Sequence, residues 1–176
     1  MSKNFRENEN EGELEDRLEK YLSEWFDVER QVKSESGKSR IDMVVVHKSD
    51  KEKMYPFGIE VKVDRKKRGK DIALWFIQAV RYTKEKFKGY GKCIILTCPP
   101  ISGHYLDEGP YVNNHGGCHP HNNVSTFLGH FGIGEVQKYE WYGKAGYLFA
   151  YNSFTFWRSN DDRLNINMIN KRWKKE

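Results

Sequence analysis

The sequence lacks the long apolar run, about 18 residues, that a membrane-spanning helix requires. Residues 1–16 are rich in charged residues and asparagine and lack the apolar centre of a signal peptide. The 3 cysteines, Cys93, Cys98 and Cys118, are too few for a disulfide framework. We therefore expect a cytoplasmic protein that is neither secreted nor bound to a membrane.

What is present indicates a globular protein with a strongly solvated surface. The 176 residues are 38% hydrophobic and 31% charged, which is typical of one domain with a sizeable core. A formal net charge of +5 favours an anionic partner such as nucleic acid. Composition predicts a disordered lead over residues 1–11 and a single domain over 12–176. We divide that domain into a core (12–98), a loop insertion (99–130), additional strands (131–158) and a basic tail (159–176).

The apolar spacing in the first half predicts a mixed α/β core. Residues 13–26 carry apolar side chains at helical spacing, and 28–33 form a weak strand candidate. Residues 41–47 and 57–63 have the β-branched composition of strands, and their short connection predicts an antiparallel hairpin. A helix is expected from an N-cap at Asp71 to about Phe87, with Trp75, Gln78 and Tyr82 flanking its apolar stripe. The apolar run 92–97 then fits a buried strand reached through a crossover.

The second half is less regular. Residues 101–130 are rich in Gly, His, Asn and Pro and predict a long loop. Residues 131–142 and 146–157 indicate an aromatic hairpin, and the basic tail suggests a short helix. Aromatic residues at this density favour packing into the core over base-stacking platforms, with Trp141 and Tyr142 as the exposed exceptions.

The segment 58–63 carries the chemistry. Side chains alternate along a strand, so Glu60 and Lys62 share one face while the apolar residues take the other. An acid and a base on a buried strand are costly unless they are paired or used. Asp42 leads the preceding strand, and pairing of the two strands would bring both acids together as a divalent-metal site. The alternative is a surface ion pair between Glu60 and Lys62 on an edge strand.

In this order the residues resemble the PD-(D/E)xK nuclease superfamily, which has the restriction-endonuclease-like fold. Arg40-Ile41-Asp42 stands where the family has Pro-Asp, with Ile41 as the departure, and Glu60-Val61-Lys62 stands where it has (D/E)xK. The segment 78–82, Gln-Ala-Val-Arg-Tyr, matches the pattern of the RecB-like branch, and Glu15 looks like the first-helix acid of Holliday-junction-resolvase-type members. The resemblance covers residues 12–98.

The resemblance implies a mixed central sheet flanked by helices and a Mg²⁺-dependent nuclease, with Mn²⁺ able to substitute. Asp42, Glu60, the Val61 carbonyl and Glu15, directly or through water, would hold the metal. Lys62 would orient or deprotonate the attacking water or neutralise the transition state, while Gln78 and Tyr82 would position and support it. The implied partner is DNA, and a homodimer is the assembly that analogy favours.

Two further groups have less specific patterns. The basic run after Glu60-Val61-Lys62, together with one basic residue of the following helix, would contact DNA phosphates. The ordinary interpretation of such a run is a solvated turn. The residues are Arg65, Lys66, Lys67, Arg68, Lys70 and Arg81. A His/Cys group in the loop could bind Zn²⁺, but its spacing matches no strong zinc motif and a Gly/His/Asn loop over the site is the simpler alternative; the residues are His115, Cys118, His119 and His121. A His-centred nuclease site would use His119, Asn122 and Asn123.

We therefore predict a metal-dependent deoxyribonuclease that hydrolyses phosphodiester bonds with a metal-activated water. A catalytically silent nucleic-acid-binding module on the same fold would keep the basic residues and bind DNA without cutting it. An RNA-directed nuclease is the third alternative, although no residue pattern points to recognition of a 2′-hydroxyl.

Overall fold

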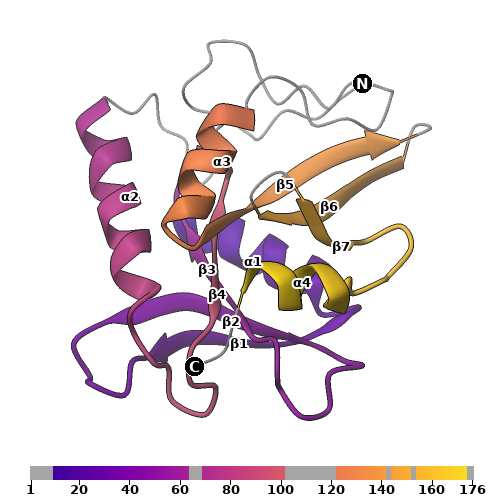
Figure 1. The fold of residues 1–176 in the computed structure, drawn as a ribbon, viewed down its shortest axis with the longest axis horizontal. Helices are drawn as coiled ribbons and strands as arrows, with labels where there is room; N and C mark the ends of the chain where they lie inside the picture. The colour runs from indigo at the N-terminus through magenta and orange to yellow at the C-terminus, as the bar shows by residue number, and fades with distance from the viewer. Residues whose placement is uncertain (1–9, 64–68, 102–121, 142–143, 152–153, 174–176) are drawn as a thin grey trace.

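The fold is seen in a computed structural model, which describes residues 10–63, 69–101, 122–141, 144–151 and 154–173 (Figure 1). Helices and strands alternate along the first half of the chain, and strands dominate the second. The elements are α1 (Glu11–Leu22), β1 (Phe26–Lys33), β2 (Arg40–His47), β3 (Phe57–Val61), α2 (Gly69–Tyr82), β4 (Ile94–Cys98), α3 (Asn122–His130), β5 (Ile133–Trp141), β6 (Lys144–Tyr151), β7 (Phe154–Arg158) and α4 (Ile166–Arg172).

The strands of the described chain form one mixed sheet of 7 strands, in the order β1-β2-β3-β4-β5-β6-β7. β3, β4 and β5 run parallel to one another, and the remaining neighbours pair antiparallel. The α/β class and the mixed sheet flanked by helices are confirmed. Two further predictions are confirmed: β2 pairs antiparallel with β3, and a crossover through α2 brings β4 parallel to β3.

Helices cover both faces of the sheet. On one face the leucines of α1 and Ile169 of α4 pack with alternate residues of the strands, including Ile59 and Leu96. On the other, Trp75 of α2 and Leu128 of α3 join the strand residues of opposite parity. Because side chains alternate in a strand, Gly58 and Glu60 point towards the second face. We call this the α2 face.

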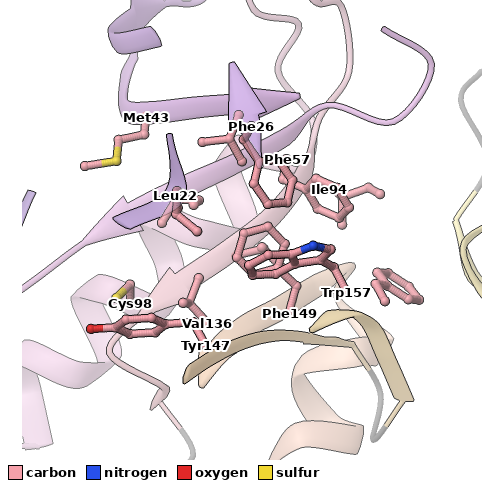
Figure 2. Close-up of a cluster of buried hydrophobic side chains, with 14 of the residues drawn as sticks. Leu22, Phe26, Met43, Phe57, Ile94, Cys98, Val136, Tyr147, Phe149 and Trp157 are labelled. Atoms are coloured by element: carbon pink, nitrogen blue, oxygen red, sulfur yellow. The ribbon is translucent and has the colours of Figure 1, made fainter. Parts of the chain in front are cut away.

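The aromatic strands pack into the core on the first face, as their density predicts. Phe149 and Trp157 are fully buried, and their ring centroids lie 5.0 Å apart. Figure 2 shows both rings gathered with Phe26 and Phe57, and the Phe26 and Trp157 centroids are 4.8 Å apart in an edge contact. The side chains of Trp141 and Tyr142 lie outside the described residues.

Helix ends differ from the sequence prediction. The helix expected to reach Phe26 ends at Leu22, where the Ser23 amide donates to the Glu19 carbonyl, because Phe26 already pairs with His47 in the sheet. The second helix begins at Gly69, so Asp71 lies in its first turn and is not the N-cap. It ends at Tyr82, and Phe87 instead forms β-bridges.

The second half also departs from expectation. The predicted loop 99–130 ends in a helix, α3, because Leu128 and the half-buried Val124, one turn apart, pack against the α2 face. The single strand expected over 146–157 is two antiparallel strands, β6 and β7, with Tyr151 opposite Phe154. The aromatic hairpin is thus a three-strand meander. A short helix, α4, does form in the tail.

Several expectations fall outside the described residues. They concern the lead over 1–9, the basic turn over 64–68, the His-rich loop over 102–121 and the last residues of the tail. Within the described ranges, every helix is too short or too polar to cross a bilayer.

Candidate active site

The two predicted acids lie side by side at the ends of β2 and β3. The antiparallel register of β2 and β3 runs as far as the Met43–Ile59 pair, and Asp42 and Glu60 are the next residues on the two strands. The Asp42 carboxylate accepts a hydrogen bond from the Val61 amide, at 2.7 Å. The charge of Asp42 raises the pKa of Glu60, so the two carboxyl groups lie close together.

Lys62 closes this pair from the end of β3. Its Nζ lies 2.6 Å from Glu60 Oε1 and donates to the Val61 carbonyl at 3.1 Å. Glu60 is only 1% exposed, and β3 lies between β2 and β4 in the sheet. The alternative of a surface ion pair on an edge strand is therefore wrong, because Glu60 is buried on a central strand and Lys62 is half-buried directly after it.

The buried charges perturb one another. Burial, and next the charge of Asp42, raise the pKa of Glu60 from 4.5 to about 7, although Lys62 acts in the opposite direction. Burial is the largest single effect on Lys62 and would lower its pKa, but the charge of Glu60, the hydrogen bond to Glu60 and the charge of Asp42 together outweigh burial, so the pKa lies above its usual value. Glu60 is thus a carboxyl group on which negative charge is costly near neutral pH, unless more positive charge is supplied.

The oxygen atoms at this point suit a hard cation. Neither oxygen of Glu60 has a hydrogen bond of normal geometry to the described residues, despite the short distance to Lys62. From the described part of the chain, Asp42 Oδ1 accepts a long hydrogen bond from Gln31, at 3.4 Å. Mg²⁺ is commonly held by one or two carboxylates together with water and substrate oxygens. Asp42 and Glu60 fit that pattern, whereas no group of 3 or more His, Cys, Asp or Glu side chains converges within the described residues.

Glu15 lies near this pair but is engaged elsewhere. Its carboxylate forms an ion pair with Arg30, which also binds Asp16. Gln31 lies between Glu15 and Asp42, because its Nε2 is 3.5 Å from Glu15 Oε2 and 3.4 Å from Asp42 Oδ1. Gln31 adopts a left-handed backbone with φ of 55°. The first-helix acid is thus connected to the site through an amide, and its charge is already balanced by a guanidinium.

Gln78 and Tyr82 of α2 form a hydrogen-bonded chain beside Glu60. Gln78 Nε2 donates to the Tyr82 hydroxyl at 2.7 Å, and that hydroxyl donates to the Arg40 carbonyl at 2.8 Å. Burial, and next the charge of Glu60, raise the pKa of Tyr82 to about 12. Tyr82 therefore ties α2 to β2 as a neutral phenol. Trp75, expected on the same flank, is 2% exposed and belongs to the core.

The remaining predicted residues are only partly placed. Arg81 is exposed on α2, and its guanidinium donates to the Lys38 carbonyl at 3.1 Å. The others have side chains outside the described residues; they are Arg65, Lys66, Lys67, Arg68, Lys70, His115, Cys118, His119, His121, Asn122 and Asn123. Phosphate contact and zinc binding by these residues stay predictions.

Sequence reasoning missed two buried polar residues beside Glu60. In the parallel registers Thr97 of β4 pairs with Glu60, and Glu135 of β5 pairs with Thr97. Thr97 is 0% and Glu135 is 1% exposed. Glu135 had only a weaker form of the signal that identified Glu60, because its strand also contains Gln137, Lys138 and Glu140. Gln31 had no such signal, because its position depends on an unusual backbone angle.

Comparisons with protein-family models, curated proteins and solved structures find no match for this chain. The family resemblance therefore depends on the sequence motifs alone.

Proposed function

We propose that the protein is a metal-dependent deoxyribonuclease that hydrolyses phosphodiester bonds at the Asp42–Glu60–Lys62 site. The observation that carries the proposal is the burial of Glu60 with a raised pKa between a second carboxylate and an amine on a central strand. Strongly perturbed titratable groups that cluster with charged partners are typical of functional sites.

The arrangement of the elements supports a restriction-endonuclease-like core. The chain runs through α1, three antiparallel strands, α2 and then β4 parallel to β3. The acids lie on neighbouring strands, and the helix with the Gln-Ala-Val-Arg-Tyr segment packs over the face to which they point. This is the order in which the resemblance expects its motifs.

Each residue at the site can contribute a defined step. A divalent cation bound by Asp42 and Glu60 would polarise the attacking water and the scissile phosphate. Binding of an anionic phosphate favours release of Lys62 from Glu60, since the ammonium can then pair with the phosphate oxygens. There it would stabilise the negative charge that develops in the transition state. Tyr82 and Gln78 would keep α2 at a fixed distance from these groups.

One observation favours the second candidate, a catalytically silent nucleic-acid-binding module. The Glu60–Lys62 pair is already closed, and Glu60 is almost without solvent contact. In the silent module, this pair would hold the end of β3 in place and would have no other task. Such a module would bind DNA without using the two acids.

The two functions are separated by incubating the protein with labelled single-stranded, duplex and branched DNA, and with RNA, in the presence of Mg²⁺ or Mn²⁺. The nuclease proposal expects metal-dependent products that decrease by at least about 100-fold in Glu60→Gln and Asp42→Asn, with DNA binding retained. Glu24→Gln, which removes an exposed carboxylate from the turn after α1, is the matched control and should cut normally.

Full cleavage by either purified site variant would refute the assignment of the acids. A salt-sensitive complex without products under all these conditions would favour the silent module. Products from RNA alone would leave the site in place and change the substrate. Gel filtration of the same samples tests the predicted homodimer.

A further inference from the structure

β1 changes face part-way along its length. Val28 packs against the cluster that contains the α1 leucines, whereas Val32 belongs to the cluster on the α2 face. Residues four apart in a regular strand point to the same face, so the strand turns over between these two valines. β2 does the same beside it, because Ile41 and Met43, two residues apart, also lie in different clusters. The irregularity therefore crosses both strands and includes Asp42, the residue between Ile41 and Met43.

A left-handed residue accounts for this change in β1. Gln31 has a φ of 55°, which is costly for most residues other than glycine. The other described residues with such an angle, among them Gly37 and Lys53, lie in connections between elements, whereas Gln31 lies within a strand. A glycine would turn the strand over at less cost. The glutamine therefore indicates that a side chain is needed at this position, and retained strain of this kind is typical of functional sites.

The left-handed backbone brings two consecutive side chains to one carboxylate. Consecutive residues of a regular strand point to opposite faces. Here the Arg30 guanidinium and the Gln31 amide both donate to Glu15 Oε2, the amide at 3.5 Å. The same amide nitrogen lies 3.4 Å from Asp42 Oδ1. Because an amide NH₂ group has two donor hydrogens, Gln31 can serve the acids of α1 and β2 at the same time.

Asp42 is thereby held from two sides. Its Oδ2 accepts a hydrogen bond from the Val61 amide of β3, and its Oδ1 accepts one from Gln31 of β1. β2 lies between these two strands in the sheet, so both of its neighbours fix the carboxylate. The contacts of Gln31 are long, but hydrogen bonds to ionised acceptors are stronger than those between neutral groups. The direction in which Asp42 presents Oδ1 therefore depends on this amide.

We propose that Gln31 is a positioning residue of the Asp42–Glu60–Lys62 site, and that its amide orients the Asp42 carboxylate towards a bound cation and keeps Glu15 beside it. The inference rests on the proposed function, which supplies the cation, but it concerns a residue that the sequence motifs do not include. Replacing a group that orients metal ligands typically weakens metal binding by about 10- to 100-fold. The opposing view is that Gln31 only shapes the strand, and its replacement would then act through stability alone.

Two replacements separate the amide from the backbone. Gln31→Gly removes the amide and relieves the left-handed angle, so its midpoint in urea should be no lower than that of wild type. Gln31→Met removes the amide but keeps the length of the side chain and the strained angle, so its midpoint should be lower than that of Gln31→Gly. Full-length, metal-free protein is then titrated with Mn²⁺ alone, and the free ion is measured by electron paramagnetic resonance. We expect both variants to bind Mn²⁺ about 10- to 100-fold more weakly than wild type.

Lys53→Gly is the matched control. Lys53 has a φ of 51° in the connection between β2 and β3, so glycine relieves a similar angle outside the site. This variant should bind Mn²⁺ with unchanged affinity. Circular dichroism checks that each variant is folded, and Gln31→Gly decides the question if Gln31→Met does not fold.

The outcomes distinguish this proposal from the proposed function. Similar loss of Mn²⁺ affinity in both Gln31 variants, despite their different midpoints, supports positioning by the amide. Mn²⁺ affinity that is unchanged in both, or that follows the midpoints, overturns the role of Gln31. Loss of Mn²⁺ binding in Asp42→Asn would then leave the proposed nuclease site intact. Absence of Mn²⁺ binding by wild type overturns the role of Gln31 together with the metal site.

Discussion

The raised pKa of Glu60 predicts a specific dependence of stability on pH. In the metal-free protein its carboxyl holds a proton up to a pKa of about 7, compared with the ordinary value of 4.5 that it regains on unfolding. The folded state therefore binds more protons than the unfolded state between these values. Stability contributed by protonated Glu60 is fully present below 4.5 and is lost as the pH rises to about 7.

The size of the effect follows from the shift. About 2.5 pKa units at 1.36 kcal/mol each correspond to about 3 kcal/mol, a large part of the stability of a domain of this size. Glu60→Gln cannot titrate, so this component of the pH dependence should be missing from the variant. Asp42→Asn removes the second largest cause of the shift and should move the transition to lower pH.

Urea denaturation in the presence of a chelator, at a series of pH values, measures this directly. The informative quantity is the difference in the free energy of unfolding between wild type and Glu60→Gln, because other titrating groups cancel in it. Glu24→Gln should follow the wild type throughout. If the difference for Glu60→Gln is constant from pH 4.5 to 7, the carboxyl is not perturbed in the manner described.

Three further predictions test the surroundings of the site. Tyr82→Phe removes the donor to the Arg40 carbonyl and should cost about 1–2 kcal/mol of stability by denaturant titration; an unchanged midpoint would mean that the phenol does not tie α2 to β2. Trp157→Ala should cost about 3–5 kcal/mol, or abolish folding, because the ring is fully buried among aromatic residues, and a midpoint within error of wild type would contradict that packing. Asn10→Ala should lower stability by about 1 kcal/mol, since Asn10 and Glu13 form a capping box at the start of α1, whereas Asn10→Ser should retain most of it.

The central strands could be predicted from sequence because their signals are local and strong. β-branched runs separated by a short polar turn specify the β2–β3 hairpin, and alternation along the two strands predicts that Asp42 and Glu60 come together, as their interaction shows. An acid within an apolar strand is costly unless it has a role, so Glu60 was identifiable before its neighbours were known.

The rest depends on contacts distant in sequence. Helical spacing continues to Phe26 and to Phe87, yet Phe26 pairs with His47, and the chain turns back at Phe87 to pair with Gly91. The position of Thr97 between Glu60 and Glu135 depends on β3, β4 and β5 lying parallel in one register, which no local pattern encodes. The pairing of Glu15 with Arg30 likewise depends on how α1 packs beside β1.

The parallel arrangement of β3, β4 and β5 also bears on how such a protein can diversify. Chain segments leave β3 after Val61 and β4 after Cys98, at the edge where Glu60 and Thr97 are located. Connections tolerate insertions and deletions far better than the strands that they join. Insertions, deletions or substitutions just after these two strands could therefore change substrate selection at the acids without altering the hydrogen bonds of the sheet.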